Sequence, residues 1–282
     1  MRPTRISALP VAALLLLFTL AGPTATATAG AGTPSAARWA PRASATITPG
    51  VQMFTAGAQC TGNFVFTDDA GHVYVGYAAH CAGKGGQTDT DGCTTQSLPN
   101  GTPVEVTGAS KPGTLVYNSW TAMQQAGETD ADTCAFNDIG LIKLDPADYG
   151  KVNPSVPTLG GPTALGETTA QLDTVYTYGN SSLREGVTLL SPKIGKSLGA
   201  SGGGWTHLVY TVSPGIPGDS GSGFMDAQGR AFGVLSTLQL APIVLSNGVS
   251  DLRKMLAYAR THGGPDVTLA PGTEAFTGSL VG

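Results

Sequence analysis

Short runs of apolar residues, broken by polar and turn-forming positions, follow one another along most of the chain after about residue 51, and they predict β-strands separated by tight turns. The first two runs, residues 63–67 and 72–77, flank the turn sequence Asp68–Gly71 and therefore predict a hairpin. Further strands are expected at 104–107, 114–117, 139–144, 170–178, 187–190, 208–212, 221–225, 231–238 and 243–246. A bridge rich in Pro and Gly, from 145 to about 166, separates two strand-rich halves.

One helix is predicted near the C-terminus. Apolar residues at 252, 255, 256 and 259 recur with the spacing of a single helical face. Ser250 is the expected N-cap, and Gly263 is the expected stop. No organisation is predicted for the tail that follows.

The N-terminal 29 residues have the pattern of a secretory signal: Arg2 and Arg5, an apolar run at 8–21, then small residues at 23–29. The apolar run is shorter than the roughly 20 residues that a membrane span needs, although a retained anchor is the alternative. We expect cleavage near Ala27 or Ala29 and a secreted, extracellular product without membrane attachment.

The amino-acid composition excludes some classes of protein. Among 282 residues only 12% are charged, 40 are Gly, and the formal net charge is −4. This balance argues against a basic nucleic-acid binder, and the 41% hydrophobic content argues against a disordered chain.

If the protein is exported, its four cysteines are expected to form disulfides. An even number in an oxidising compartment indicates two disulfides, for which three pairings are possible. A zinc site is the competing interpretation, but the chain contains no C-x-x-C pair. The cysteines are Cys60, Cys81, Cys93 and Cys134.

Three short segments carry candidate chemistry: residues 77–81 with His80, 136–141 with Asp138, and 217–223 with Ser220. A serine hydroxyl is a weak nucleophile that needs an adjacent base, and histidine is the usual base near neutral pH. A carboxylate behind the imidazole fixes its tautomer. Glycines around the serine allow backbone N–H groups to converge on one point and form an oxyanion hole.

With these three motifs in the order His, Asp, Ser, the sequence resembles the trypsin/chymotrypsin-like serine proteases, most closely the bacterial secreted members. The resemblance implies an all-β fold of two antiparallel six-stranded β-barrels, with the active site between them and a C-terminal α-helix. The expected division is a signal peptide at 1–29, a linker or short pro-segment at 30–48, an N-terminal barrel at 49–160, a C-terminal barrel and helix at 161–264, and a tail at 265–282.

The resemblance also implies roles for individual residues. Ser220 would attack the carbonyl, His80 would accept and return the proton, and Asp138 would orient His80. The backbone N–H groups of Gly218 and Ser220 would form the oxyanion hole, and Ser236 would lie on the strand that supports the buried Asp138 and pairs with the substrate backbone.

Substrate would bind along Ser236, Thr237 and Leu238, with Pro214 at the base of the specificity pocket. A Cys60–Cys81 disulfide is implied beside the histidine, which leaves Cys93 and Cys134 as the second pair.

Several departures from the family pattern affect specificity and activation. Pro214 stands where trypsin-like enzymes carry an Asp, so we expect no preference for a basic P1 residue, and a small or apolar one instead. No cysteines flank Ser220. Asp219 needs a partner when buried, and Arg184 is the candidate; an exposed Arg184 is the alternative.

The function predicted from the sequence is a secreted, monomeric serine endopeptidase that acts on polypeptides without a metal or cofactor. Two alternatives stay open: a catalytically silent binding protein with the same fold, and an esterase that uses the same triad.

Overall fold

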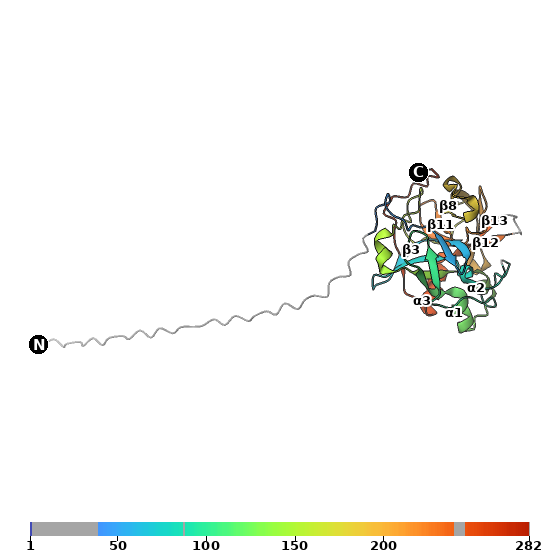
Figure 1. Cartoon of the computed structure of the whole chain (residues 1–282), viewed down its shortest axis with the longest axis horizontal. Coiled ribbons are helices and arrows are strands. Elements are labelled where there is room, and N and C mark those ends of the chain that lie inside the picture. The colour runs from blue at the N-terminus through green and yellow to red at the C-terminus, as the bar shows by residue number, and fades with distance from the viewer. Residues whose placement is uncertain (2–38, 87, 240–245, 282) are drawn as a thin grey trace. The chain divides into compact units, whose positions relative to one another are not determined.

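The computed structural model describes Met1 and residues 39–86, 88–239 and 246–281 (Figure 1). Most of the predicted signal peptide, the first part of the predicted linker and residues 243–245 of the last predicted strand lie outside these residues. Apart from Met1, the described residues belong to one compact unit, Pro34–Gly282. No helix in the described ranges is both long enough and apolar enough to span a bilayer.

Strands from the first half of the chain, joined by β14 from the C-terminal tail, form an eight-stranded antiparallel sheet of order β14-β3-β4-β7-β6-β5-β1-β2. Its strands are β1 (Gln52–Thr55), β2 (Ala58–Thr61), β3 (Val65–Thr67), β4 (Val73–Tyr77), β5 (Pro103–Val106), β6 (Gly113–Asn118), β7 (Gly140–Lys143) and β14 (Thr268–Leu269). This sheet is the first β-unit of the predicted all-β, two-barrel fold, which is confirmed, and it contains eight strands where six were expected. The β1–β2 hairpin and β14 end the sheet at two edges, because no pairing joins β2 to β14 in the described ranges.

The second half forms the expected closed six-stranded barrel, with strand order β10-β13-β12-β11-β8-β9. Its strands are β8 (Thr174–Tyr178), β9 (Pro192–Ser201), β10 (Thr206–Thr211), β11 (Gly223–Asp226), β12 (Ala231–Gln239) and β13 (Ser246–Asp251). Pairing between β9 and β10 closes the ring. Its interior contains Val175, Val209, Phe224, Phe232, Leu235 and Val249.

The predicted hairpin is confirmed, and its turn shows why the sequence folds back at this point. β3 pairs with β4 in antiparallel register. The Asp68 carboxylate accepts backbone N–H groups of Ala70 and His72 at 3.0 and 2.9 Å, and Gly71 has the positive φ of 78° that completes the turn.

The C-terminal helix is confirmed as α3 (Leu252–Thr261), but its cap differs from the predicted one. Ser250 is paired with Thr206 and Val234 in the barrel, so it belongs to β13. Asp251 instead caps the helix by accepting the N–H of Lys254 at 2.8 Å.

The prediction of a strand at 187–190 is wrong. Residues Thr188–Leu190 form a 3-10 helix, η4, whose apolar side chains are exposed, with Leu189 at 74%. A strand gains stability from a partner strand and a buried face, and this segment has neither.

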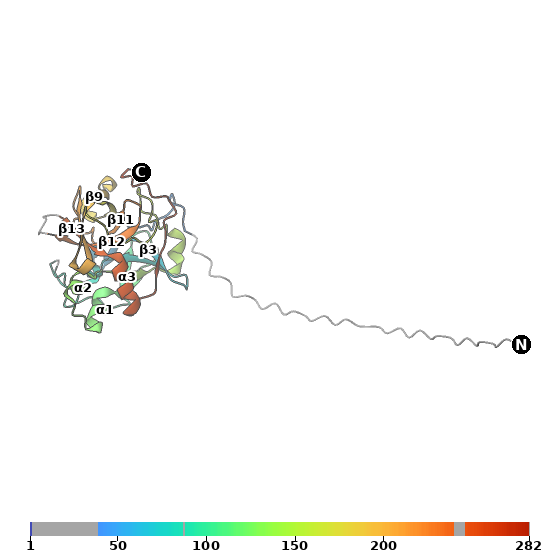
Figure 2. The ribbon, with the colours of Figure 1, turned by 180° about the vertical axis from the view of Figure 1, so that it is seen from behind.

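Helices in the first half were not predicted. α1 (Ser119–Ala126) and α2 (Ala131–Phe136) fill the connection between β6 and β7, and Asn118 and Asp130 cap them. α1 lies beside α3 (Figures 1 and 2). Both new helices are too short for a clear helical periodicity. The remaining short helices are η1 (Ala79–Ala82), η2 (Pro146–Lys151), η3 (Ser182–Arg184) and η5 (Gly202–Gly204).

The predicted linker (30–48) and the predicted tail (265–282) both contain residues that pack against the two β-halves. In the predicted linker, Ile47 is fully buried and forms a parallel bridge with Val152. In the tail, β14 adds to the edge of the first sheet through β3. Further on, the Phe276 ring packs edge-on against Tyr176 of the second barrel, with centroids 5.3 Å apart. The tail therefore contacts both halves.

Candidate active site

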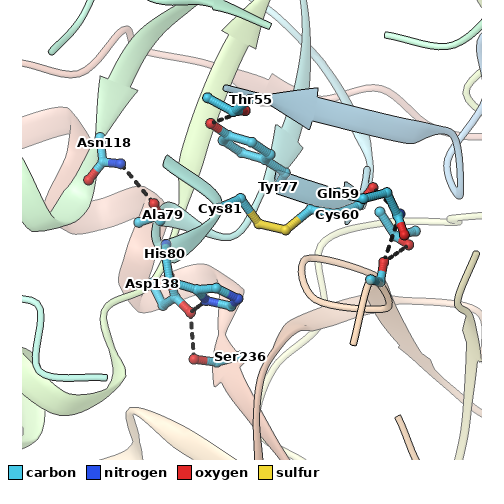
Figure 3. Close-up of a disulfide and its surroundings, with 12 residues drawn as sticks. Thr55, Gln59, Cys60, Tyr77, Ala79, His80, Cys81, Asn118, Asp138 and Ser236 are labelled. Carbon is cyan, nitrogen blue, oxygen red and sulfur yellow. Dashed lines mark hydrogen bonds and ion pairs between the residues drawn. A yellow bond between two sulfur atoms is a disulfide. The ribbon is translucent and has the colours of Figure 1, made fainter. Parts of the chain in front are cut away.

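His80 and Asp138 meet because their strands are paired. Tyr77 of β4 lies opposite Gly140 of β7, so the residues just beyond these positions leave the sheet at the same end. His80 Nδ1 lies 2.7 Å from Asp138 Oδ2, and the His80 backbone N–H donates to Asp138 Oδ1 at 2.9 Å (Figure 3). The Asp138 side chain is 2% exposed and that of His80 is 26% exposed, so the carboxylate is shielded while the imidazole reaches solvent.

Ser236 provides a third contact to the same carboxylate. Its hydroxyl, from β12 of the second barrel, donates to Asp138 Oδ2 at 2.5 Å (Figure 3). Asp138 thus joins a histidine of the first half to a serine of the second.

The electrostatics of the pair favour its charged form. Burial opposes ionisation of Asp138, but the charge of His80 and the hydrogen bonds from His80 and Ser236 hold its pKa below the ordinary value. Burial likewise disfavours a charged imidazole, yet the neighbouring carboxylate raises the pKa of His80. An imidazole with raised basicity is better suited to accept a proton from a hydroxyl.

The segment that carries His80 is fixed on several sides. The side-chain amide of Asn118 donates to the carbonyl of Ala79 at 2.9 Å. A disulfide joins Cys81 to Cys60 of β2, directly beside the histidine (Figure 3). The second disulfide joins Cys93 to Cys134.

The turn that contains Ser220 packs against β2 and against the segment that leads to His80. The N–H of Thr61 donates to the Ser220 carbonyl at 2.8 Å, and the N–H of Gly221 donates to Leu235. Gly221 has a φ of 88°, and a Cβ there would lie only 2.8 Å from the backbone nitrogen of Ala78. Only glycine permits this approach. Within the described ranges no hydrogen bond joins Ser220 Oγ to His80; such bonds are often loose before substrate binds.

Two backbone donors in this turn have no acceptor in the described part of the chain: the N–H groups of Gly218 and Ser220. The N–H between them, on Asp219, is satisfied by the Ile216 carbonyl at 2.9 Å. Gly218 has a φ of 95°, and a Cβ there would collide with the side chain of Gln59. The turn therefore presents two unpaired donors around a glycine that no other residue could replace without strain.

The side chain of Asp219, in the same turn, is buried, and its carboxylate accepts hydrogen bonds from two cationic side chains. Arg184 donates from both terminal nitrogens, at 2.5 and 2.7 Å. Lys193 donates to Oδ2 at 2.6 Å. Burial disfavours the Asp219 anion, but the two cations outweigh burial and lower its pKa. Arg184, the candidate partner named from the sequence, therefore contacts Asp219, and the alternative of an exposed Arg184 does not hold.

Sequence reasoning missed Lys193. Its side chain is 3% exposed, and burial lowers its pKa despite the partner carboxylate. Lysines are rarely buried, and the residues around Lys193 in the sequence contain no acid that would mark it as paired. Only the folded structure, in which Asp219 lies next to Lys193, explains why this lysine is buried.

The predicted substrate-binding residues occupy two places. Ser236, Thr237 and Leu238 lie on β12 beyond Val234, where its pairing with β11 ends. Pro214 borders a pocket of about 370 Å³. This pocket is lined by Leu183, Arg184, Glu185, Leu190, Ser213, Pro214 and Ile216. The carbonyl of Pro214 accepts from Lys193 at 3.4 Å.

Among the residues that the structure describes, two side-chain groups have ligand atoms close enough together to hold a metal ion: Cys60 with His80 and Cys81, and Asp91 with Cys93 and Cys134. In each group the two sulfur atoms are joined in a disulfide, so neither supplies the thiolates that a metal would bind.

The fold formed by these two β-halves is that of the chymotrypsin-like serine proteases, and similarity to a solved structure agrees. Protease A of Thermobifida fusca matches with a TM-score of 0.52 and 17% identity, over 81% of this chain and 100% of that one. A protease of Nocardiopsis and a chymotrypsin of Cellulomonas bogoriensis are each 16% identical, with TM-scores of 0.45 and 0.44. Each comparison covers 79% of this chain and 98% of the other. No family model and no curated protein matches the chain.

Proposed function

We propose that this protein is a secreted serine endopeptidase that hydrolyses peptide bonds through an acyl-enzyme on Ser220. The proposal rests above all on Asp138, a shielded carboxylate that accepts from both the ring and the backbone of His80. This arrangement holds the imidazole in one orientation with its other nitrogen free to act. The two-barrel fold supports proteolysis in general.

In the proposed reaction, His80 removes the proton of Ser220 as its oxygen attacks the substrate carbonyl. The imidazolium formed is stabilised by Asp138. The N–H groups of Gly218 and Ser220 would donate to the developing oxyanion, which is consistent with their lack of another acceptor. His80 then returns the proton to the leaving amine, and water hydrolyses the ester by the reverse sequence.

We propose further that the enzyme does not favour Lys or Arg at P1. Pro214 offers no carboxylate at the expected base of the pocket. Behind it, Arg184 and Lys193 place two cations against the single carboxylate of Asp219. The excess positive charge near the pocket would repel a basic side chain.

Labelling with a fluorescent fluorophosphonate tests the catalytic part, with Ser220→Ala as the control. We expect the parent protein to be labelled and the variant to remain unlabelled. An unlabelled parent protein would favour a silent binding protein. Digestion of a peptide library would then separate an endopeptidase from an esterase and report the P1 residue, and N-terminal sequencing of the exported protein would test cleavage near Ala27 or Ala29.

A further inference from the structure

Ser181 contacts the turn that carries the two unpaired N–H groups. It is the N-cap of η3 and is almost completely buried. Its hydroxyl donates to the carbonyl of Pro217 at 2.5 Å. Its backbone N–H donates to Asp219 Oδ1 at 3.1 Å. One residue therefore touches the turn on both sides of Gly218.

The bond to Pro217 fixes the direction of the Gly218 N–H. The peptide between Pro217 and Gly218 is trans, so its C=O and N–H point in opposite directions within one plane. Holding the Pro217 oxygen toward Ser181 therefore turns the Gly218 N–H to the opposite side. No other hydrogen bond reaches this oxygen from the described part of the chain.

The peptide needs such a bond because sterics alone do not hold it. Gly218 lacks a side chain and occupies a φ of 95°, where glycine passes between conformations at little cost. The remaining contacts of the turn act on the next peptide: Thr61 Oγ1 donates to the Gly218 carbonyl at 2.7 Å. Within the described residues these contacts do not involve the peptide between Pro217 and Gly218.

We propose that Ser181 is a positioning residue that orients the Gly218 N–H toward the oxyanion of the transition state. This inference rests on the proposed function, because it concerns a donor that acts only during catalysis. The hydroxyl also accepts the N–H of Leu183 at 3.1 Å, so a purely structural role as the cap of η3 is the competing explanation.

The test compares Ser181→Ala with Ser182→Ala, using a fluorophosphonate as the probe. Ser182 is the matched control, because it is the adjacent serine, is exposed, and its hydroxyl makes no hydrogen bond within the described ranges. The maximal rate of inactivation, kinact, reports transition-state stabilisation, and KI reports initial binding. We expect kinact to fall about tenfold in Ser181→Ala, the effect of losing one buried hydrogen bond, with KI within about twofold of the parent protein. Ser182→Ala is expected to match the parent protein, and Ser181→Thr, which keeps the hydroxyl, to recover most of the lost rate.

The outcomes separate this inference from the proposed function. A parent protein that does not react at Ser220 would overturn both. A reactive parent with equal kinact in the two alanine variants would overturn only the role of Ser181. The same holds if Ser181→Ala fails to fold while Ser181→Thr folds, because the hydroxyl would then support the fold and not the donor.

Discussion

Replacing Arg184 and Lys193 separately by methionine tests how the buried Asp219 carboxylate is stabilised. Asp219 is completely buried, and both cationic side chains are less than a tenth exposed. Arg184 makes two hydrogen bonds to the carboxylate, whereas Lys193 makes one. With two cations and one anion, the cluster holds one positive charge without a counter-charge.

This charge count predicts unequal effects on the free energy of unfolding. Opposite charges attract by about 4 kcal/mol at 4 Å with an effective dielectric constant near 20, but each buried ion also loses several kcal/mol of hydration. In Lys193→Met, Asp219 keeps Arg184 and the excess charge disappears, so we expect a change within about 1 kcal/mol. In Arg184→Met, Asp219 loses two hydrogen bonds and its better-matched partner, and we expect a loss of about 3 kcal/mol.

Urea unfolding at pH 7 measures the difference, in a Ser220→Ala background, which would prevent self-digestion under the proposed function. The reasoning is refuted if Lys193→Met destabilises the protein more than Arg184→Met does. The pH dependence is a second check on the same residue. Because the pKa of Asp219 is lowered in the folded state, its contribution is present above the unfolded pKa of about 4 and is lost as the pH falls through the folded value.

Three further predictions concern the site and the tail. Ser236→Ala removes a hydrogen bond to Asp138, so we expect the fluorophosphonate rate to fall about fivefold, the effect of one modest hydrogen bond; an unchanged rate would count against this role. The rate should rise with pH with a midpoint above 6.5, the ordinary pKa of histidine, because the pKa of His80 is raised, and a midpoint below 6.5 would contradict the pairing. Deleting residues 265–282 removes β14 and the contact of Phe276, and should lower the free energy of unfolding by about 4 kcal/mol; equal urea midpoints for the two proteins would show that the tail does not stabilise the fold.

Local patterns in the sequence predicted the elements whose causes are local. The hairpin depends on Asp68 and Gly71 within its own turn, and the residues between 252 and 259 repeat with a helical period over more than two turns. The contact between His80 and Asp138 could be predicted from the family motifs. Their spacing along the chain, 58 residues, could not have predicted it alone.

The features that were missed depend on distant partners. The sequence near Lys193 looks like that of an exposed lysine, and only a carboxylate 26 residues away explains its burial. Ser181 meets Pro217 across 36 residues. The strand predicted at 187–190 failed for the same reason, since apolar content alone does not supply a partner strand.

The site depends on bonds that cross between the two halves of the fold. Asp138 is held by His80 of the first half and by Ser236 of the second. In the other direction, Thr61 of β2 donates to both Ser220 and Gly218 in the turn that follows the second half's β10. Each half therefore positions groups of the other, and neither holds all the residues of the candidate site by itself. Since these hydrogen bonds break when the halves separate, reactivity toward a fluorophosphonate should be lost at the same temperature at which the halves separate, and not before it.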